Sequence, residues 1–576
     1  MTSRSSRPGG SGRWPIAAAS VLVLALLAGC ISGKGGSGDS AEVNHSGGTL
    51  RLAVTGLTSY DPATVVPTDQ AEMVAADLVS DGLTAIDAQS GAVVPSLAES
   101  WVADDAGTRW TFTLRDGAMF SDGSPVTAAD VVTALSRVAA RGSATLAAAR
   151  LEEISGYADL VAGRTTSLAG LEAVDDRTLT ITTTSSDVEL PLLLGSPVYG
   201  VMKVSPTAEV TTTASTAAPG SAGVDGGALT GSGPFAVASD DGTTLHLVRV
   251  SSSVAELDGV DLVRVADGPA ADAAVRDGSA DWAPLSGVTA AAAASASSTS
   301  TSTSTSTATT DSPGTTGPDG TAPADSTVVK TAPLGAEEFF GMNVANPVLT
   351  NPVFRQAIVK GIDRAKLVTL GPAGLRPSSA VVPPGVPGAV DDPCGSPCAY
   401  DPAAAKALVA QAFPGGGVPT VDVDTDDDPA DVALANAVQA SLVAIGVPAN
   451  VVVKPFAEYQ RFVTTGQQQL FRTGWVGMAP SPGSYLDPLF RSNSLDNLTA
   501  LASASVDTRL GTARATKDDA ARVAQYQALE KDVLALWPVV PLGSYVASVR
   551  LSARVEHYVQ RLDGTFDALQ VQVGSS

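Results

Sequence analysis

The chain has 576 residues, of which 44% are hydrophobic and 16% are charged, and its formal net charge is −24. This length exceeds one ordinary hydrophobic core and predicts two or three domains, while the composition excludes a largely disordered chain. The strongly acidic balance argues against binding to nucleic acid or to an anionic membrane through the protein surface.

The first thirty residues have the pattern of an export signal. Three arginines precede the apolar run WPIAAASVLVLALLAG, which is short for a membrane span and is followed by Cys30. The sequence LAGC at this point resembles the bacterial lipobox, which implies that Cys30 becomes the lipidated first residue of the mature protein. We expect residues 1–29 to be a signal peptide and 30–47 a flexible tether. A plain secretory signal with an incidental cysteine is the alternative.

Strand and helix patterns follow one another in the first half of the chain. Apolar and polar residues alternate in 48–57, 108–117 and 177–184, which predicts strands. Between the last two, Thr127 begins a predicted helix, and Asp130 stands three residues later as in a capping box.

Two stretches, 205–231 and 290–326, are rich in Ala, Ser, Thr, Gly and Pro. Such a composition buries too little apolar surface to offset the entropy of ordering, so we expect these stretches to be disordered. Strong patterns resume on both sides of each stretch, which favours surface insertions within a fold. A linker between independent domains is the alternative.

Proline pairs mark helix starts in the second half. The Asn-Pro pair at 351–352 begins a helix that Gly361 ends, and the Asp-Pro pair at 401–402 begins another. A later helix closes at Gly446 and precedes a strand, and the last long helix stops at Pro538 before another strand. Helices alternating with strands at this spacing predict an α/β protein.

Two cysteines, Cys394 and Cys398, lie in DPCGSPCAYDP. In an oxidising compartment this spacing around Gly and Pro favours a small-loop disulfide over a metal site. Two thiolates without a nearby histidine cannot complete a four-ligand zinc shell. We expect neither a metal nor a cofactor.

The stretch 471–490, FRTGWVGMAPSPGSYLDPLF, concentrates aromatic residues in a chain that is only 5% aromatic. Its prolines and glycines interrupt any regular period, which predicts a loop. The rings either pack a core or form the wall of a ligand site, because rings on a stiff loop offer apolar faces with few rotamers to freeze.

Several segments, in this order, resemble the family 5 extracellular solute-binding proteins, the dipeptide- and oligopeptide-binding lipoproteins of ABC importers. The resemblance is carried by residues 95–132, 231–237, 351–368, 398–412 and 474–490. It implies an α/β, bilobal periplasmic-binding-protein-like fold (type II, cluster C) with an extra small domain and disordered insertions. A hinge would close the two lobes around a ligand, and the closed form would engage the permease.

The same resemblance implies a division of the chain. Lobe I would comprise residues 48–85, 176–345 and 541–576, with both low-complexity stretches inside its second piece. Residues 86–175 would form the small domain, and 346–540 would form lobe II.

In the peptide-binding branch, a loop that reads Gly-Trp and then Asp lines the closed cleft, and the Asp takes the α-ammonium of the ligand. Gly474 and Trp475 match this pattern, but the position of the Asp falls on Met478. The acid that a buried ammonium requires is therefore missing there. A peptide is the first expectation for the family, while a blocked peptide, a sugar or another neutral or anionic solute fits Met478 better.

Three further residues of this stretch are ligand-binding candidates. Arg472 either holds a ligand carboxylate through a forked pair or makes a surface salt bridge. Tyr485 and Asp487 complete the set, and Asp487 is the next carboxylate after Met478.

An enzyme is the first competing function, but the sequence offers little catalytic chemistry. The three histidines are His45, His246 and His557, and no H-E-x-x-H, G-x-S-x-G or phosphate-binding Gly-Lys motif occurs. A family member repurposed as a non-transport envelope sensor or scaffold is the second alternative, and a surface hydrolase is a weaker one. We expect a monomer on the outer face of the cytoplasmic membrane, with a solute, an ABC permease and the membrane as partners.

Overall fold

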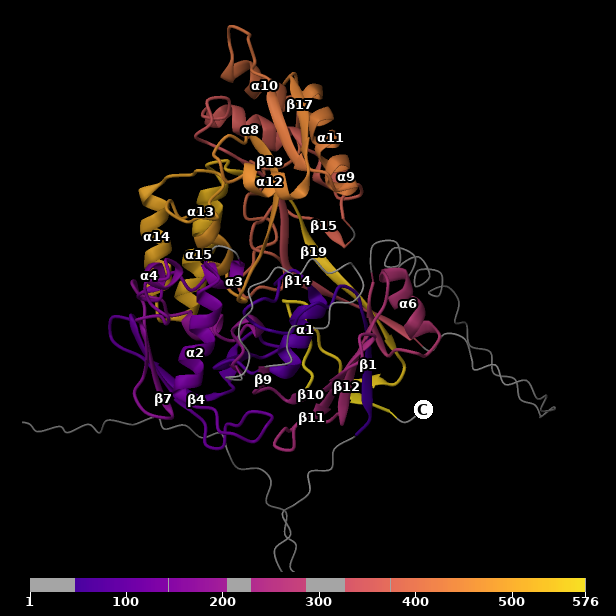
Figure 1. The fold of residues 1–576 in the computed structure, drawn as a ribbon. Helices are drawn as coiled ribbons and strands as arrows, with labels where there is room; N and C mark the ends of the chain where they lie inside the picture. The colour runs from indigo at the N-terminus through magenta and orange to yellow at the C-terminus, as the bar shows by residue number, and fades with distance from the viewer. Residues whose placement is uncertain (1–46, 143–144, 205–228, 286–326, 373, 575–576) are drawn as a thin grey trace, which may run out of the picture. The chain divides into compact units, whose positions relative to one another are not determined.

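The computed structural model describes residues 47–142, 145–204, 229–285, 327–372 and 374–574 (Figure 1). Cys30, the predicted signal peptide before it and nearly all of both low-complexity stretches lie outside these residues. Within the described part of the chain, none of the helices has the length and apolar character needed to cross a membrane.

Among the described residues, eleven strands form one mixed sheet. Its order is β10-β11-β12-β1-β13-β19-β14-β18-β16-β17, and β15 pairs with β19. The strands are β1 (Thr49–Val54), β10 (Phe235–Asp240), β11 (Thr244–Arg249), β12 (Gly259–Arg264), β13 (Trp282–Pro284), β14 (Thr327–Met342), β15 (Leu375–Pro377), β16 (Val421–Asp426), β17 (Ala449–Lys454), β18 (Leu470–Val476) and β19 (Val539–Ser552).

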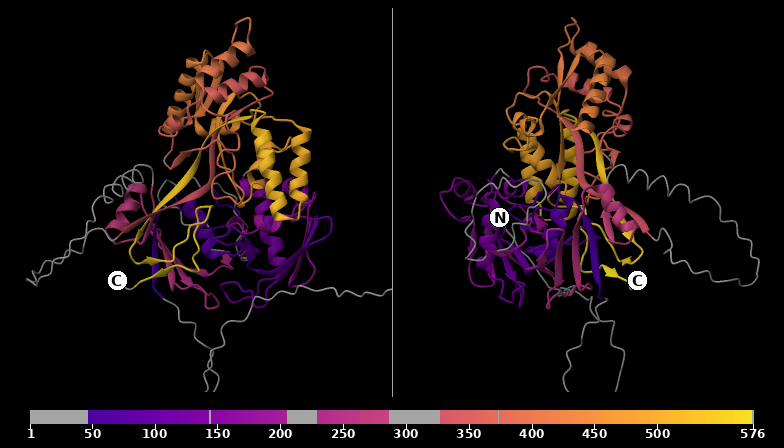
Figure 2. Two further views of the ribbon diagram at one scale, coloured as in Figure 1. Left: turned by 180° about the vertical axis from the view of Figure 1, so that it is seen from behind. Right: turned by 45° about the vertical axis from the view of Figure 1, so that its right-hand side comes forward.

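The strands β14 and β19 connect two hydrophobic cores. They pair antiparallel and run side by side from the strands around β1 to those around β18 (Figures 1 and 2). Val549 and Leu551 of β19 are buried in the core around β1 and β12, whereas Val540 and Leu542 are buried in the core around β16 and β18. One continuous strand therefore stabilises both cores.

The core around β16 and β18 is covered by the helices of the second half. They are α8 (Pro352–Gly361), α9 (Arg364–Leu367), α10 (Pro402–Ala412), α11 (Pro429–Ala444), α12 (Phe456–Phe462), α13 (Gly483–Phe490), α14 (Ala504–Ala515) and α15 (Asp519–Leu534). Asn351 caps α8 by accepting the N–H of Val353, which confirms the predicted start at the Asn-Pro pair.

The core around β1 and β12 draws on segments from both ends of the chain. Besides its strands it includes α1 (Gln70–Val79) and residues near β20 (Val555–Glu556) and β21 (Gln572–Val573). The helix α6 (Gly268–Arg276) packs beside it with a small apolar cluster of its own.

A third core is built from residues 63–201 together with Met478. Its strands β4, β5, β7 and β6 form a separate sheet in that order, and Val131, Leu135 and Val138 of α2 are buried against it. The remaining elements are β2 (Thr84–Ile86), β3 (Val93–Pro95), β4 (Ala98–Ala103), β5 (Arg109–Leu114), α2 (Ala128–Ala139), α3 (Leu146–Ala149), α4 (Tyr157–Val161), β6 (Leu171–Ala173), β7 (Thr178–Thr182), α5 (Leu190–Leu193), η2 (Pro197–Tyr199), β8 (Met202–Val204) and β9 (Leu229–Gly231).

The capping box predicted for α2 is confirmed. The Thr127 side chain accepts the backbone N–H of Asp130, and the Asp130 carboxylate accepts the N–H of Thr127 at 2.8 Å. Each of these side chains accepts a hydrogen bond from an N–H group at the helix start that would otherwise lack an acceptor.

The prediction of a loop over 471–490 was wrong. The structure has β18 over Leu470–Val476 and α13 over Gly483–Phe490, so only 477–482 connect them. Pairing of β18 with β14 and β16 outweighs the interruptions in the local pattern. Pro482 stands at the N-cap of α13, where its missing N–H costs nothing.

Candidate functional site

Two neighbouring cavities lie where β14 and β19 lose their regular pairing. The register passes from Pro333 opposite Val546 directly to Glu337 opposite Ser544, which leaves 334–336 unpaired with β19. The larger cavity has a volume of about 580 Å³ and the smaller one about 270 Å³. They share three lining residues, Gly335, Leu562 and Asp563. The larger volume is in the range of small-molecule sites.

Apolar side chains form much of the wall of the larger cavity. They come from α3, β14, α12, β18 and the segments that follow, and they are Leu146, Leu334, Val463, Val476, Leu498 and Leu562. Three rings join them, those of Tyr459, Trp475 and Tyr545. Such a lining removes apolar ligand surface from water.

Trp475 is held in place at the larger cavity. Its Nε1–H donates to the carbonyl of Ser484 at 2.8 Å, and the Arg150 guanidinium lies 5.4 Å from the ring centroid. Gly474 allows β18 to approach β14 closely, because a Cβ there would lie 2.7 Å from the Glu337 carbonyl oxygen. The Gly-Trp pair therefore places a rigid ring at the cavity.

The other aromatic residues of 471–490 serve packing. Phe471, Tyr485 and Phe490 are each at most 1% exposed. Gly341 makes room for the Phe471 ring, since a Cβ at that position would come within 2.3 Å of it. The aromatic stretch thus divides into three buried rings, of which Tyr485 also lines the smaller cavity, and one less buried ring, Trp475, at the larger cavity.

Arg472 belongs to a buried ion cluster on the wall of the larger cavity. Its Nε lies 2.9 Å from Glu338 Oε1 and 3.1 Å from Asp431 Oδ1. Tyr545 donates its hydroxyl hydrogen to Glu338 Oε2 at 2.8 Å. The side chains of Glu338 and Asp431 are 1% and 7% exposed, so their charges depend on Arg472.

Burial raises the pKa values of both acids in this cluster. Burial raises the pKa of Glu338 to about 7, against the opposing charge of Arg472. Burial also raises the pKa of Asp431, and Arg472 again opposes the shift. Two carboxylates already share this guanidinium, so a ligand carboxylate would compete with them for it. The predicted alternative of a surface salt bridge does not describe this pairing either.

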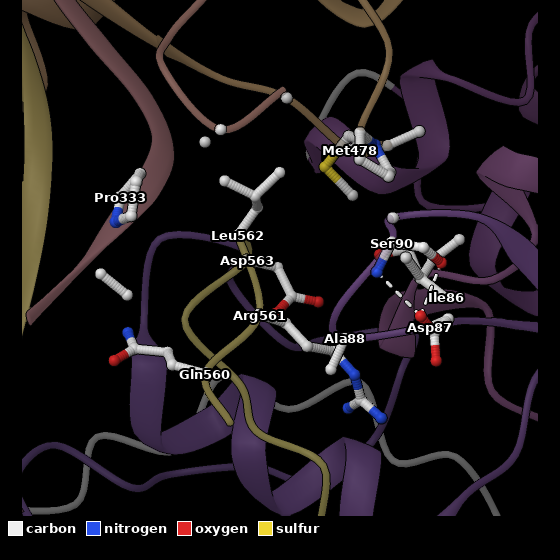
Figure 3. A pocket seen from close by; sticks show the side chains of 18 of the residues that line it. Ile86, Asp87, Ala88, Ser90, Pro333, Met478, Gln560, Arg561, Leu562 and Asp563 are labelled. Atoms are coloured by element: carbon white, nitrogen blue, oxygen red, sulfur yellow. Dashed lines mark hydrogen bonds between the residues drawn. The ribbon is translucent and has the colours of Figure 1, made fainter. Parts of the chain in front are cut away.

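Met478, labelled in Figure 3, lines the smaller cavity, and so does Tyr485. Met478 is 6% exposed and packs in the third core. The Tyr485 hydroxyl donates to the Gly335 carbonyl at 2.9 Å, and its ring lies where a Cβ on Gly477 would come within 2.4 Å. Both residues are closely packed and form part of the cavity wall.

Asp487 lies away from both cavities. It is on α13, with Oδ2 at 3.3 Å from Arg491 Nε and 3.9 Å from Arg514. These arginines also pair with Glu153 and Asp187 of the segment that packs in the third core. Asp487 is therefore part of an ion network that links α13 and α14 to that segment.

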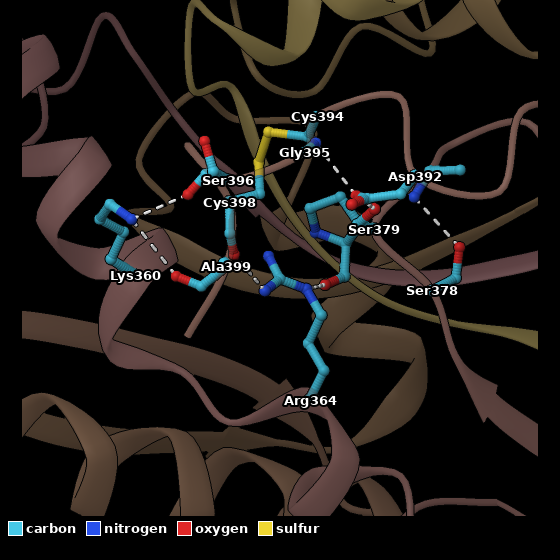
Figure 4. Close-up of a disulfide and its surroundings, with 12 residues drawn as sticks. Lys360, Arg364, Ser378, Ser379, Asp392, Cys394, Gly395, Ser396, Cys398 and Ala399 are labelled. Atoms are coloured by element: carbon cyan, nitrogen blue, oxygen red, sulfur yellow. Dashed lines mark hydrogen bonds between the residues drawn. A yellow bond between two sulfur atoms is a disulfide. The ribbon is translucent and has the colours of Figure 1, made fainter. Parts of the chain in front are cut away.

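The structure joins Cys394 and Cys398 in a disulfide with a Cα–Cα distance of 5.6 Å (Figure 4). Arg364 donates from Nη1 to the Cys398 carbonyl at 2.8 Å and from Nε to the Pro541 carbonyl at 2.6 Å. The cross-linked loop is thereby held against β19. Closing so short a loop removes little entropy from the unfolded chain.

Sequence reasoning missed Glu338, Asp431, Tyr545 and Asp563 as cavity residues or their partners. The run Ala336-Glu337-Glu338-Phe339 carried one usable signal, because two acids inside an apolar strand must find partners when buried. Asp563 stands in an ordinary Asp-Gly turn and gave no signal.

Comparison with known proteins decides the family. The model described as "Bacterial extracellular solute-binding proteins, family 5 Middle" matches residues 92–497. The chain belongs to family 5. Its resemblance over 95–132 and 351–368 is thereby confirmed.

Two relatives from Escherichia coli (strain K12) match parts of this family 5 chain. The probable deoxycholate-binding periplasmic protein YgiS is 41% identical over 129 residues, which are 21% of this chain and 24% of YgiS. The glutathione-binding protein GsiB is 28% identical over 222 residues, which are 37% of this chain and 43% of GsiB. Each match spans less than half of the relative.

The fold matches across nearly the whole chain. The solved structure of clavulanic acid biosynthesis oligopeptide binding protein 2 has a TM-score of 0.74 at 22% identity, and the match covers 92% of this chain and 96% of the other. At this identity the likeness shows the fold alone. The mixed α/β fold predicted from the resemblance is confirmed.

Proposed function

We propose that this protein is the extracytoplasmic solute-binding receptor of an ABC importer and that it takes a peptide or peptide-like solute. The observation that carries the proposal is the cavity of about 580 Å³ at Trp475, in a chain that belongs to family 5. Relatives named for glutathione and oligopeptide binding support the peptide class.

The three separate cores support a division of the chain into lobe I, a small domain and lobe II, with the third core extending beyond 86–175 to residues 63–201. In this proposal β14 and β19 are the connections between the lobes, and the unpaired 334–336 segment lies at the cavities between them. Enclosure between lobes would remove the solute from water and strengthen each polar contact with it.

The cavity charges disfavour an anionic solute such as deoxycholate. Arg472 pairs with Glu338 and Asp431, and Arg561 pairs with Asp77 at 2.7 Å. A bound anion would therefore find no uncommitted guanidinium among these cavity residues. A neutral or cationic group of the solute needs no guanidinium partner and is not disfavoured in this way.

Trp475→Ala is expected to weaken peptide retention about tenfold or more, because it removes a fixed apolar wall. The purified protein would be incubated with a defined pool of lysine-free tri- to pentapeptides, and retained peptides identified by mass spectrometry after ultrafiltration. Trp101→Ala is the matched control, since Trp101 stacks on Phe112 of β5 and lines neither cavity. If the unaltered protein retained no peptide, the proposed class would be wrong.

The proposal includes a lipid anchor at Cys30. Cys30→Ala is expected to move the protein from the membrane pellet to the soluble fraction, because the acyl chains supply the membrane affinity. Fractionation of cells followed by immunoblotting measures the change. Ser32→Ala, two residues further on, should leave the protein in the pellet. Equal distribution of Cys30→Ala and the unaltered protein would contradict the anchor.

A further inference from the structure

We propose that Asp563 binds a cationic group of the solute, such as the amino terminus of a peptide, at the junction of the two cavities. This inference rests on the proposed function and names the chemistry of its solute. Asp563 reaches the site from the C-terminal segment between β20 and β21, and Figure 3 shows its carboxylate beside Leu562 at the smaller cavity.

The turn that carries Asp563 is held rigidly. Asp563 Oδ1 accepts the N–H and the hydroxyl of Thr565 at 2.9 and 2.7 Å. The Leu562 carbonyl accepts the N–H of Gly335 at 2.7 Å, and the Gly564 carbonyl accepts from Gln70 Nε2 at 2.7 Å. The hydrogen bonds to Oδ1 and the backbone contacts of Leu562 and Gly564 restrain the Asp563 carboxylate. It therefore loses little conformational entropy when it binds a ligand.

Asp563 keeps one oxygen available. Its Oδ2 has no hydrogen-bond donor among the described residues, whereas Oδ1 is occupied by Thr565. The other acid at the smaller cavity, Asp87, accepts the N–H and the hydroxyl of Ser90 at 2.8 and 2.6 Å. At the larger cavity, Glu338 is committed to Arg472 and Tyr545. Glu337 also lines that cavity, but burial raises its pKa well above the usual value and so favours the uncharged acid.

The surroundings of Asp563 favour a positive partner. Met478 and Leu562 line the same cavity and offer no side-chain donor, and the donors of Ser196 and Gln560 in its wall make no hydrogen bond to Asp563, so a ligand ammonium would supply the missing donors. Arg561 is adjacent in sequence and its charge interacts with that of Asp563, but its Nη1 is held by Asp77 and by the Phe566 carbonyl at 3.0 Å, and it makes no hydrogen bond to Asp563. In this proposal, the acid that the family resemblance implies at the position of Met478 is provided from a distant segment.

Asp563 lines both cavities, so a ligand ammonium placed there has the cavity of about 270 Å³ on one side and the cavity of about 580 Å³ on the other. The larger cavity offers room for the rest of a short peptide. A short peptide with a free amino terminus is therefore the expected solute class.

The test compares a pool of lysine-free tri- to pentapeptides with the same pool after acetylation of every amino terminus. Retention by the full protein is measured by ultrafiltration and mass spectrometry. Acetylation is expected to weaken retention about tenfold or more, and Asp563→Asn to abolish this preference, because both remove one side of the ion pair. Asparagine keeps the Oδ1 acceptor for Thr565.

Asp567→Asn is the matched control. Asp567 lies on the same segment, accepts the N–H of Leu569 at 3.2 Å and lines neither cavity, so the preference should persist. Equal retention of both pools by the unaltered protein would overturn the role of Asp563 and leave the receptor function standing. A preference that survives in Asp563→Asn would overturn it as well. Retention of neither pool would overturn the proposed function itself.

Discussion

Replacing Arg472 with methionine is expected to lower the free energy of unfolding by about 3–5 kcal/mol near pH 8. The substitution leaves Glu338 and Asp431 buried without their shared cation, and Glu338 Oε1 alone lies 2.9 Å from the lost Nε. Burial of an uncompensated charge is among the costliest single changes in a folded protein. Urea unfolding followed by circular dichroism measures the change.

The loss should shrink near pH 5. The pKa of Glu338, already raised to about 7 by burial, moves higher without Arg472, so the acid takes up a proton and sheds its charge. Adding Glu338→Gln to Arg472→Met should restore part of the stability at the higher pH, because the two positions are coupled.

Arg509→Met provides the control for Arg472→Met. It breaks the pair with Asp532 at 2.5 Å, whose side chains are 35% and 62% exposed, and should cost less than about 1 kcal/mol. Similar losses in Arg509→Met and Arg472→Met would show that the buried cluster does not contribute as argued.

Local signals predicted the parts of the fold that depend on local contacts. Thr127 with Asp130, and the Asn-Pro pair at 351–352, satisfy helix ends within four residues, so their sequence is sufficient evidence. The strand over Leu470–Val476 is different, because its partner β14 lies more than a hundred residues earlier in the chain. The glycines and prolines of 471–490 therefore indicate a loop when only local signals are considered.

Some residues of the site could be predicted from the sequence and others could not. Trp475 could be placed at a cavity because the Gly-Trp pair is part of the resemblance to family 5. Asp487 could not be placed, since the turn of α13 directs it toward Arg491 and Arg514. Asp563 reaches the cavity only because β19 and the segments after it return to the core around β1. No residue spacing in the sequence predicts a contact between segments so far apart in the chain.

The protein is expected to lose stability as the pH rises from about 5 to 8, because buried acids prefer their protonated form. Burial raises the pKa of Glu530 to about 7 and raises that of Glu337 well above its usual range, with Glu530 and Glu338 adding repulsion at Glu337. Both acids bind more protons in the folded than in the unfolded chain. Their contribution is complete below the unfolded pKa and is lost as the pH passes the folded one.

Glu530→Gln isolates one of these contributions. Glu530 Oε1 accepts the N–H groups of Val381 and Val382 at 2.9 and 3.0 Å, and the glutamine carbonyl can accept both. The variant should therefore be more stable than the unaltered protein near pH 8, by up to about 3 kcal/mol, since each pKa unit corresponds to about 1.4 kcal/mol. Near pH 5 this advantage should disappear.

Urea unfolding at several pH values measures the slope of the free energy of unfolding against pH. Glu458→Gln is the control. Glu458 is exposed on α12, so its substitution should change stability by less than about 0.5 kcal/mol at each pH. Removing the Glu530 charge also removes repulsion at Glu337, so the Glu530→Gln slope should flatten by more than one titrating group alone explains. An unchanged slope in Glu530→Gln would mean that the Glu530 carboxylate stays ionised in the folded protein.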